Sequence, residues 1–304
     1  MAIEWGVGMV GVDDFPLVTV CVISYNSCET IIETLESIKK QTYANIELIV
    51  SDDNSKDGTV SVINEWCKVN GDRFVAYKIL TVDKNTGVTG NCNRAVKNAS
   101  GEFIKDIGAD DILLPTYIED CVNYFIDNSN CGILFTKLTP FYENDISHIV
   151  NIEENYDFFN LSQSEQWQYI INNGLPLLPT PTSIYRKTTL QNIGFYDMDI
   201  PMWEDGPMYF RLSEAGVKFF LLEKEEVLYR IRSNSLSNNL PKRHIISISI
   251  FYLKYFYKYE KMNNKLKAFY HYFKYSIGRR VNNPLFYFLF LITQLHVKKQ
   301  ASEI

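Results

Sequence analysis

The sequence predicts an α/β protein with a mostly parallel, Rossmann-like sheet flanked by helices, followed by a C-terminal helical extension. In the first third of the chain, short apolar runs alternate with segments whose apolar residues recur at helical spacing. Beyond residue 240 the chain becomes basic, aromatic and helical in pattern. We therefore expect a main domain at 1–240, with halves at about 16–112 and 113–240, and an extension at 241–304.

The first half shows four strand signals separated by three helix signals. Near-continuous apolar, β-branched runs are typical of buried parallel strands, and they occur at Leu17–Ser24, Ile46–Ser51, Phe74–Leu80 and Glu102–Ile107. Apolar residues at helical spacing predict helices after Ser27, which can cap the first, and at Thr59–Val69 and Val88–Asn98. This alternation predicts a doubly wound parallel sheet.

The second half is less regular. Residues 137–165 are polar, which predicts a loop-like lid or a helical excursion. Three prolines between 176 and 181 interrupt any regular element there. Beyond them we expect a helix at Asp205–Ala215 and two strands at Val217–Leu222 and Val227–Ile231.

Composition limits the class of protein. An apolar fraction of 46% is enough for a large core and argues against global disorder. The six cysteines form no C-x-x-C pair, so we expect reduced thiols in a cytosolic protein. Residues 1–12 lack the basic start and long apolar run of a signal peptide. The sequence has no G-x-x-x-x-G-K-[ST] motif, which argues against a P-loop kinase.

The charge is unevenly distributed. Residues 241–304 contain 12 Lys and Arg against 2 Asp and Glu, whereas residues 1–240 contain 18 against 34. The basic extension predicts an anionic surface as a partner, and the acidic main domain argues against nucleic acid. The apolar run Pro284–His296 is shorter than the roughly 20 residues that a membrane span needs. Two readings stay open: an in-plane membrane helix, or a helical cap packed on the main domain.

Two acidic pairs follow predicted strands. Asp52-Asp53 comes directly after Ile46–Ser51, and Asp110-Asp111 follows the strand that begins at Glu102. Open α/β sheets bind ligands at the carboxyl ends of their strands. Mg²⁺ typically takes one or two carboxylates and completes its shell with water and substrate phosphates. The second pair therefore predicts a metal-assisted site for a phosphorylated donor.

Five motifs in order resemble glycosyltransferase family 2, over roughly residues 16–240. They are Val20-Cys21-Val22-Ile23-Ser24-Tyr25-Asn26, the segment Ser37–Thr59 with its Asp52-Asp53, Asn85-Thr86-Gly87-Val88, Ala109-Asp110-Asp111 and Trp203-Glu204-Asp205. The resemblance implies a GT-A fold and transfer of a sugar from a nucleotide diphosphate with inversion. It also implies that 16–112 binds the nucleotide and 113–240 the acceptor.

The resemblance implies roles for individual residues. Asp53 would hold a uracil ring, Asp110 the ribose, and Asp111 a Mn²⁺ or Mg²⁺ ion. Other expected donor contacts are Ser24, Tyr25, Asn26, Asn85, Gly87, Arg94 and Arg232. For Arg94 and Arg232, an ordinary surface arginine is an equal alternative. For Asp52 and Asp53, the alternative is a cap on the next helix.

The Glu204-Asp205 pair is the candidate for chemistry. Inverting transfer needs a base, and the resemblance implies Asp205, with Glu204 orienting the acceptor or supporting Asp205. A carboxylate at a helix start is expected to be held ionised by the helix dipole. The structural alternative is that Asp205 is only an N-cap.

The function expected from these residues is an inverting glycosyltransferase. It would use a UDP-sugar and a saccharide acceptor, carried on a lipid, in bacterial O-antigen or capsule synthesis at the inner face of the cell membrane. One alternative is a catalytically inactive sugar-nucleotide-binding or scaffold protein of the same fold. A sugar nucleotidylyltransferase is less favoured, because Ser24–Cys28 contains neither glycine nor a basic residue.

Overall fold

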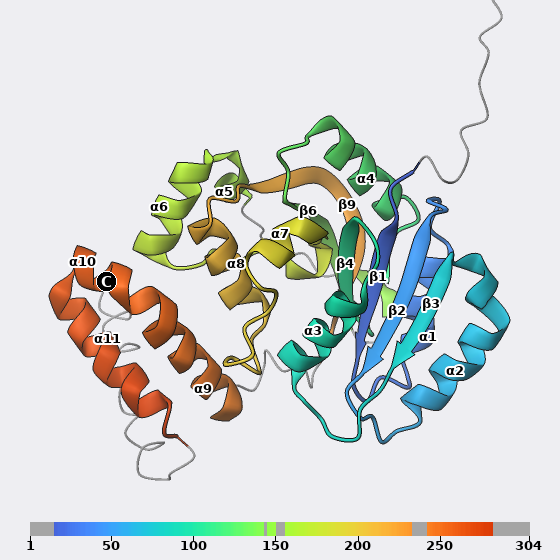
Figure 1. The fold of residues 1–304 in the computed structure, drawn as a ribbon, viewed down its shortest axis with the longest axis horizontal. Helices are drawn as coiled ribbons and strands as arrows, with labels where there is room; N and C mark the ends of the chain where they lie inside the picture. The colour runs from blue at the N-terminus through green and yellow to red at the C-terminus, as the bar shows by residue number, and fades with distance from the viewer. Residues whose placement is uncertain (1–14, 143–144, 150–155, 233–241, 282–304) are drawn as a thin grey trace, which may run out of the picture.

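The computed structural model describes residues 15–142, 145–149, 156–232 and 242–281 (Figure 1). The strands described form one sheet in the order β3-β2-β1-β4-β8-β6-β9-β5, with β7 paired to β6. The predicted first half is confirmed as four parallel strands: β1 (Val18–Ser24), β2 (Ile46–Asp52), β3 (Ala76–Leu80) and β4 (Phe103–Gly108). Their apolar side chains alternate between the two faces of the sheet, and both faces are covered.

The second half of the sheet is mixed. It contains β5 (Ile112–Leu113), β6 (Ile133–Tyr142), β7 (Asp145–Ile149), β8 (Ile184–Arg186) and β9 (Phe219–Ile231). Strand β8 lies antiparallel between β4 and β6, whereas β6 and β9 are parallel to each other. The sheet therefore changes direction at β4, next to the acidic pair that follows this strand.

Two sequence predictions for this half were wrong. The two strands expected at Val217–Leu222 and Val227–Ile231 are one strand, because cross-strand pairs hold its polar middle on β6. Lys137 Nζ lies 3.1 Å from Glu223, and Thr139 donates to Glu225 at 2.9 Å. The lid or helical excursion expected over 137–165 begins instead with β6, which runs to residue 142, and helices follow from Asp157. Register shifts near 136–138 bend these strands, which hides the simple alternation.

Helices cover both faces of the sheet. On one face α1 (Ile31–Lys39), α2 (Thr59–Asn70) and α4 (Tyr117–Asp127) pack on apolar residues of β1 and β2. On the other lie α3 (Val88–Asn98), α5 (Asp157–Asn160), α6 (Gln163–Asn173), α7 (Lys187–Asn192) and α8 (Asp205–Glu214). Short 3₁₀ turns occur at η2 (Gly71–Arg73) and η3 (Thr180–Thr182). Ser27 does not cap α1 with its side chain: the N-cap is Thr30, and the Ser27 carbonyl accepts from Ile31.

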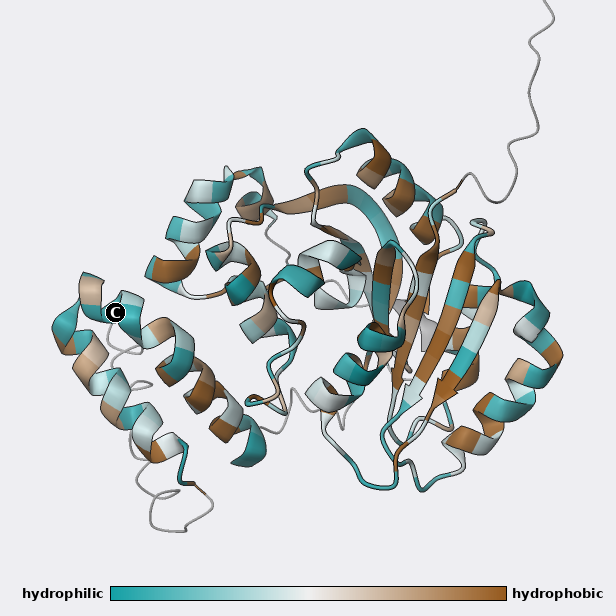
Figure 2. Ribbon diagram, viewed as in Figure 1, coloured by the Kyte–Doolittle hydropathy of each residue, from teal (hydrophilic) through white to brown (hydrophobic). Residues whose placement is uncertain are grey.

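The extension packs on the main domain at the end opposite α1 and α2 (Figure 1). It consists of α9 (Lys242–Phe251), the π-turn η4 (Tyr252–Phe256), α10 (Tyr257–Asn263) and α11 (Lys265–Gly278). Phe210 of α8 contacts four rings of the extension at centroid distances of 5.5–6.1 Å, from Phe251, Tyr255, Phe256 and Tyr259. Figure 2 shows α9 as largely hydrophobic, in contrast to α3.

This contact confirms the helical-cap reading for α9 and α10. Lysines of η4 and α10 pair with carboxylates of the main domain. Lys254 pairs with Asp197 and Asp199 at 2.7 and 2.8 Å, and Lys258 pairs with Glu214 at 2.7 Å. The apolar run Pro284–His296 lies outside the described residues. Within the described part of the chain, no helix combines the length and hydrophobicity that crossing a bilayer requires. All six cysteines are free thiols.

Candidate active site

A cavity of about 1400 Å³ opens at the carboxyl ends of the parallel strands and is lined from both halves of the main domain. Every site residue predicted from the sequence lines it except Arg94: Ser24, Tyr25, Asn26, Asp53, Asn85, Gly87, Asp110, Asp111, Glu204, Asp205 and Arg232. Ligand pockets typically enclose about 300–1,000 Å³. This cavity therefore has room for two substrates side by side.

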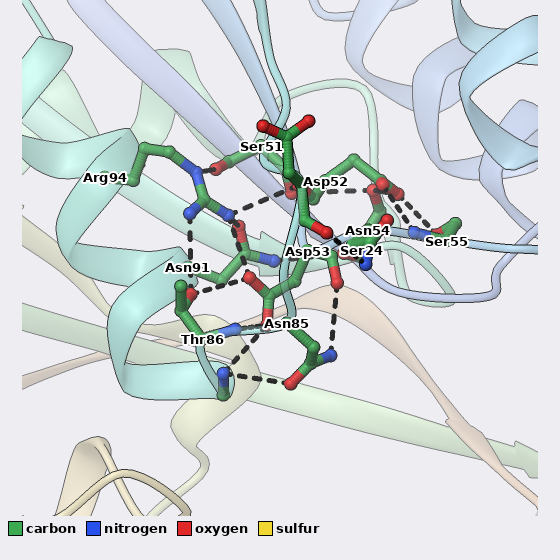
Figure 3. Close-up of polar contacts among 12 residues, drawn as sticks. Ser24, Ser51, Asp52, Asp53, Asn54, Ser55, Asn85, Thr86, Asn91 and Arg94 are labelled. Atoms are coloured by element: carbon green, nitrogen blue, oxygen red, sulfur yellow. Dashed lines mark hydrogen bonds and ion pairs between the residues drawn. The ribbon is translucent and has the colours of Figure 1, made fainter.

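Asp52 shapes the turn beside the cavity. Its fully buried carboxylate accepts from the Ser55 amide at 2.8 Å, the Ser55 hydroxyl at 2.5 Å and the Ser24 hydroxyl at 2.9 Å (Figure 3). These bonds hold the turn in which Asn54 takes a φ of 70°. Asp52 does not cap α2, since Asp57 accepts from the amide of Thr59, the first residue of that helix.

Asp53 lies at the centre of a second network, drawn in Figure 3. Its carboxylate accepts from Thr86 through the amide and the hydroxyl, from the Gly87 amide at 2.8 Å, and from Arg94 at 3.1 Å. Arg94 also donates to Ser51 and to Asn91. The surface-arginine alternative for Arg94 is therefore wrong: it lies behind the cavity wall and holds Asp53 in place.

Gly87 joins the loop of Asn85 to the segment before α8. It has a φ of 82°, and a Cβ there would lie 2.8 Å from the Pro201 carbonyl oxygen, so only glycine fits. Thr89 extends the same contact, since its hydroxyl donates to the Ile200 carbonyl at 2.6 Å. The loop of Asn85 is therefore in direct contact with the segment that leads to Glu204.

The pair Asp110-Asp111 sits over Gly108, where a Cβ would lie 2.8 Å from Asp110 Oδ1 and 3.6 Å from Asp111 Oδ2. Both carboxylates therefore border one small space that a side chain would fill. Burial raises the pKa of both groups, and the neighbouring Asp110 charge adds to the effect at Asp111. Two carboxylates that border one space in a cavity fit Mg²⁺ or Mn²⁺. The described residues contain no larger cluster of His, Cys, Asp or Glu suited to a metal.

Arg230, which the sequence prediction did not include, positions this pair. Its amide donates to Asp111 Oδ1 at 3.0 Å, its Nε donates to the Asp110 carbonyl at 2.9 Å, and its guanidinium pairs with Glu33. The sequence signal for Arg230 is its place next to Arg232 in Tyr229-Arg230-x-Arg232. Arg232 lines the cavity, and its Nη2 lies 3.6 Å from Glu29 Oε2. It is therefore not an isolated surface arginine.

Glu204 and Asp205 face the same cavity from the start of α8. Asp205 Oδ2 accepts from the Thr180 hydroxyl at 3.0 Å, and Oδ1 accepts from the Gly206 amide at 2.7 Å. The N-cap is Glu204, whose side chain makes no capping bond, so the simple N-cap reading of Asp205 is wrong. Gly206 is required here, because a Cβ would lie 2.2 Å from the Trp203 ring.

The expectation that a carboxylate at this helix start is held ionised was wrong for Glu204. Burial raises the pKa of Asp205, against the lowering effect of its bonds to Gly206 and Thr180. Burial, and then the neighbouring Asp205 charge, raise the pKa of Glu204 to about 8. At neutral pH Glu204 is therefore mostly protonated, and Asp205 is a stronger base than an exposed aspartate.

Two charged residues inside β4 support the pair and were missed. Asp106 lines the cavity and accepts from the Tyr196 hydroxyl at 2.5 Å. Lys105, the residue before Asp106, is fully buried. It donates to the Pro181 and Ser183 carbonyls at 2.6 and 3.1 Å, and these bonds fix the turn that carries Thr180. Charged residues in an otherwise apolar strand were the signal that could have identified them.

Away from the acidic pairs the cavity wall becomes apolar. Tyr156, Phe158, Tyr169, Leu177 and Leu178 line this part, and Leu177 is 89% exposed. The cavity thus has a polar end at Asp53 and Asp110, which follow β2 and β4, and an apolar end formed by side chains of α5, α6 and residues 177–178.

Comparison with known proteins identifies the family to which the chain belongs. The family model for glycosyl transferase family 2 matches residues 19–194, more than half of the chain. One curated relative is the Escherichia coli UDP-Glc:alpha-D-GlcNAc-diphosphoundecaprenol beta-1,3-glucosyltransferase WfaP. It is 28% identical over 75% of this chain and 83% of its own. An uncharacterized glycosyltransferase of Haemophilus influenzae is 27% identical over 74% and 69%.

Solved structures show the same fold. A mannosyltransferase of Pyrobaculum calidifontis, solved with GDP-Man and Mn²⁺, has a TM-score of 0.62 at 19% identity, over 83% of this chain and 67% of its own. Residues 1–349 of Staphylococcus aureus TarS, solved with UDP, have a TM-score of 0.55 at 22% identity, over 79% and 66%. This chain covers 39% of a longer TarS chain. With its GT-A fold, the protein belongs to glycosyltransferase family 2 and is a hexosyltransferase-type enzyme.

Proposed function

We propose that this protein transfers a sugar, with inversion, from a UDP-sugar to a lipid-linked saccharide in bacterial O-antigen or capsule synthesis. One observation carries the proposal: a single cavity brings Asp53, the pair Asp110-Asp111 and the pair Glu204-Asp205 together from distant parts of the chain. A protein that only bound a sugar nucleotide would not need a raised-pKa carboxyl pair beside the donor end.

The polar end is the proposed donor site. Ser24, Tyr25 and Asn26 border the space in front of Asp53, and Asn85 closes it from the loop before α3. The carboxylate of Asp53 is already engaged by four protein donors, which hold it rigidly before any ligand arrives. In this proposal the uracil meets a preorganised wall rather than a mobile side chain.

Asp111, with Asp110 beside it, would hold a divalent cation on the donor diphosphate. When bound, such an ion supplies positive charge that stabilises the departing nucleotide. The chain adds Arg232, which also lines the cavity and whose guanidinium suits phosphate oxygens. Arg230 positions this pair through its amide, which donates to the Asp111 carboxylate, and through its Nε, which donates to the Asp110 main-chain carbonyl.

Asp205 is the proposed base. An acceptor hydroxyl would lose its proton to Asp205 while its oxygen forms the new bond to the anomeric carbon. The bond from that carbon to the phosphate oxygen breaks, and UDP leaves with the electron pair. Burial makes Asp205 more basic, and the Thr180 hydroxyl aims its carboxylate. Protonated Glu204 would donate a hydrogen bond that orients the acceptor.

The apolar end of the cavity supports a lipid-linked acceptor. Tyr169, Leu177 and Leu178 line this end and Leu177 is 89% exposed, so the apolar part of an acceptor could leave the site there. WfaP is named for an acceptor of this kind, a saccharide on diphosphoundecaprenol. Because such acceptors reside in a membrane, we place the enzyme at its cytoplasmic face. Nucleic acid is not among the proposed partners.

The test is a screen of UDP- and dTDP-sugars with the full-length protein, Mn²⁺ or Mg²⁺ and a synthetic diphosphate-linked saccharide on a short polyprenyl chain. We expect metal-dependent release of UDP, a product extended by one sugar, and inverted configuration by NMR. Asp205→Asn is the matched inactive control. UDP binding without turnover for any donor would instead establish the inactive, scaffold-like alternative.

A further inference from the structure

We propose that α11 is the surface through which this protein binds an anionic lipid membrane, with the helix lying in the plane of the headgroups. The inference names the contact that would bring the enzyme to a lipid-linked acceptor, and to that extent it rests on the proposed function. It is carried by the side chains of the extension, independently of the cavity.

The outward side of α11 carries an uninterrupted apolar stripe. Leu266, Phe269, Tyr270 and Phe273 follow one another at i, i+3, i+4 and i+7, which places them on one face of the helix. Leu266 is 80% exposed, Phe269 71% and Phe273 59%, and Met262 at the end of α10 is 81% exposed. Contiguous exposed apolar residues mark an interaction surface, whereas single ones do not.

The same surface carries no exposed carboxylate. Glu260 is the only acidic residue between 242 and 281, and it is 4% exposed. Its carboxylate faces inward, where it contacts His271 Nδ1 at 2.9 Å and the Tyr252 hydroxyl. The exposed charges of α10, α11 and the two residues after α11 are therefore all positive: Lys258, Lys261, Lys265, Lys267, Arg279 and Arg280.

Some lysines of the extension face the main domain, and others face solvent. Lys254 and Lys258, which face the main domain, are paired with carboxylates of that domain. Lys261 and Lys265 lie on the solvent side next to Met262 and Leu266. A helix with an apolar face edged by lysines lies in a membrane interface, with its apolar side chains in the acyl boundary and its cations at anionic headgroups.

Charge favours a membrane over a second copy of the chain. A two-fold interface places the same patch on both sides, which would set Lys261 and Lys265 opposite like charges with no carboxylate between them. An anionic bilayer supplies the missing negative charge and also an apolar layer for Phe269 and Phe273.

Deletion of residues 241–304 is a poor test, because it would uncover the rings that pack on Phe210 and Trp167. Paired point substitutions avoid this. The apolar variant is Phe269→Glu with Phe273→Glu, both more than half exposed. Its matched control is Val69→Glu with Ile126→Glu, which are 82% and 57% exposed on α2 and α4.

A charge variant completes the set. Lys261→Gln with Lys265→Gln removes two cations from the surface, and Lys40→Gln with Lys68→Gln removes two exposed cations elsewhere. The probe is sedimentation of the full-length protein with vesicles of phosphatidylcholine alone or containing phosphatidylglycerol, at low and high salt. Circular dichroism confirms that each variant folds.

We expect the wild type to sediment with anionic vesicles and to be released by salt. The apolar variant should lose more than tenfold in partitioning, the charge variant about 30-fold at roughly 1 kcal/mol per lysine, and both controls should match the wild type. Wild type that ignores anionic vesicles would overturn the proposal. So would unchanged binding by the apolar variant, or a dimer in sedimentation velocity that this variant disrupts.

Catalysis is measured separately. Nucleotide-sugar hydrolysis in vesicle-free buffer should be unchanged in all four variants, because none of these positions lines the cavity. Vesicle binding with no hydrolysis would refute the proposed function and leave the membrane surface standing. Hydrolysis with no vesicle binding would refute the membrane surface and leave the proposed function standing.

Discussion

The hydrogen bond from Thr180 to Asp205 should set the acid limit of activity. Thr180 lies in the turn η3, and its hydroxyl donates to Asp205 Oδ2 at 3.0 Å. The substitution Thr180→Val keeps the branched shape and removes this donor. The bond favours the ionised carboxylate and lowers its pKa against the effect of burial, so its loss must raise that pKa further.

The size of the shift follows from the strength of the bond. A hydrogen bond to a charged group contributes about 1.5–3 kcal/mol, and one pKa unit corresponds to about 1.4 kcal/mol. The expected shift is therefore about 1–2 units upward. Since Asp205 must be ionised to accept the proton, the acid limb of kcat/KM should move to higher pH by that amount, and the plateau above it should change little.

The assay is UDP release across pH 5–9 with saturating Mn²⁺. Thr180→Ser is the control, because it keeps the hydroxyl and should keep the wild-type limb. A Thr180→Val enzyme that folds normally and shows an unshifted limb would refute Asp205 as the titrating base. A loss of the same factor at every pH would mean that Thr180 only shapes the turn.

Three further predictions concern other parts of the site. Asp205→Asn should abolish turnover and leave UDP affinity within about twofold, whereas Asp111→Asn should weaken metal-dependent UDP binding at least tenfold. Both affinities are measured by calorimetry. Equal losses of UDP binding in the two variants would contradict separate roles for Asp205 and Asp111. Lys105→Met should lower the free energy of unfolding by about 2–4 kcal/mol in urea, because two buried carbonyls lose their donor. Gly87→Ala should destabilise by at least about 1 kcal/mol and weaken UDP binding, because its Cβ would press on Pro201; unaltered stability would disprove that contact.

The spacing of apolar residues in the sequence was sufficient to predict the parallel half of the sheet. Strands β1, β2 and β4 are buried on both faces, so their apolar runs and the intervening helices are visible in the sequence. It was insufficient for β9, whose middle is polar and is held by partners on β6 more than 80 residues away in the chain. Pairing over such distances leaves no periodic signal.

The same division applies to the site. Asp110-Asp111 and Glu204-Asp205 were recognisable as adjacent charges after a strand and before a helix. Arg94 was not interpretable, because its role depends on contacts with Ser51 and Asp53, which lie on a different strand.

By itself, the sequence determined the α/β class, the family and eleven of the residues that line the cavity, because short-range patterns and adjacent charges survive without a folded chain. Tertiary structure alone decided that Arg94 stands behind the wall and that Lys105 and Thr180 aim Asp205. It also decided that α9 and α10 pack on the main domain while α11 keeps its apolar face exposed. The physical reason is that burial, pKa and hydrogen-bond partners are properties of neighbours in space, which a single chain of letters does not specify.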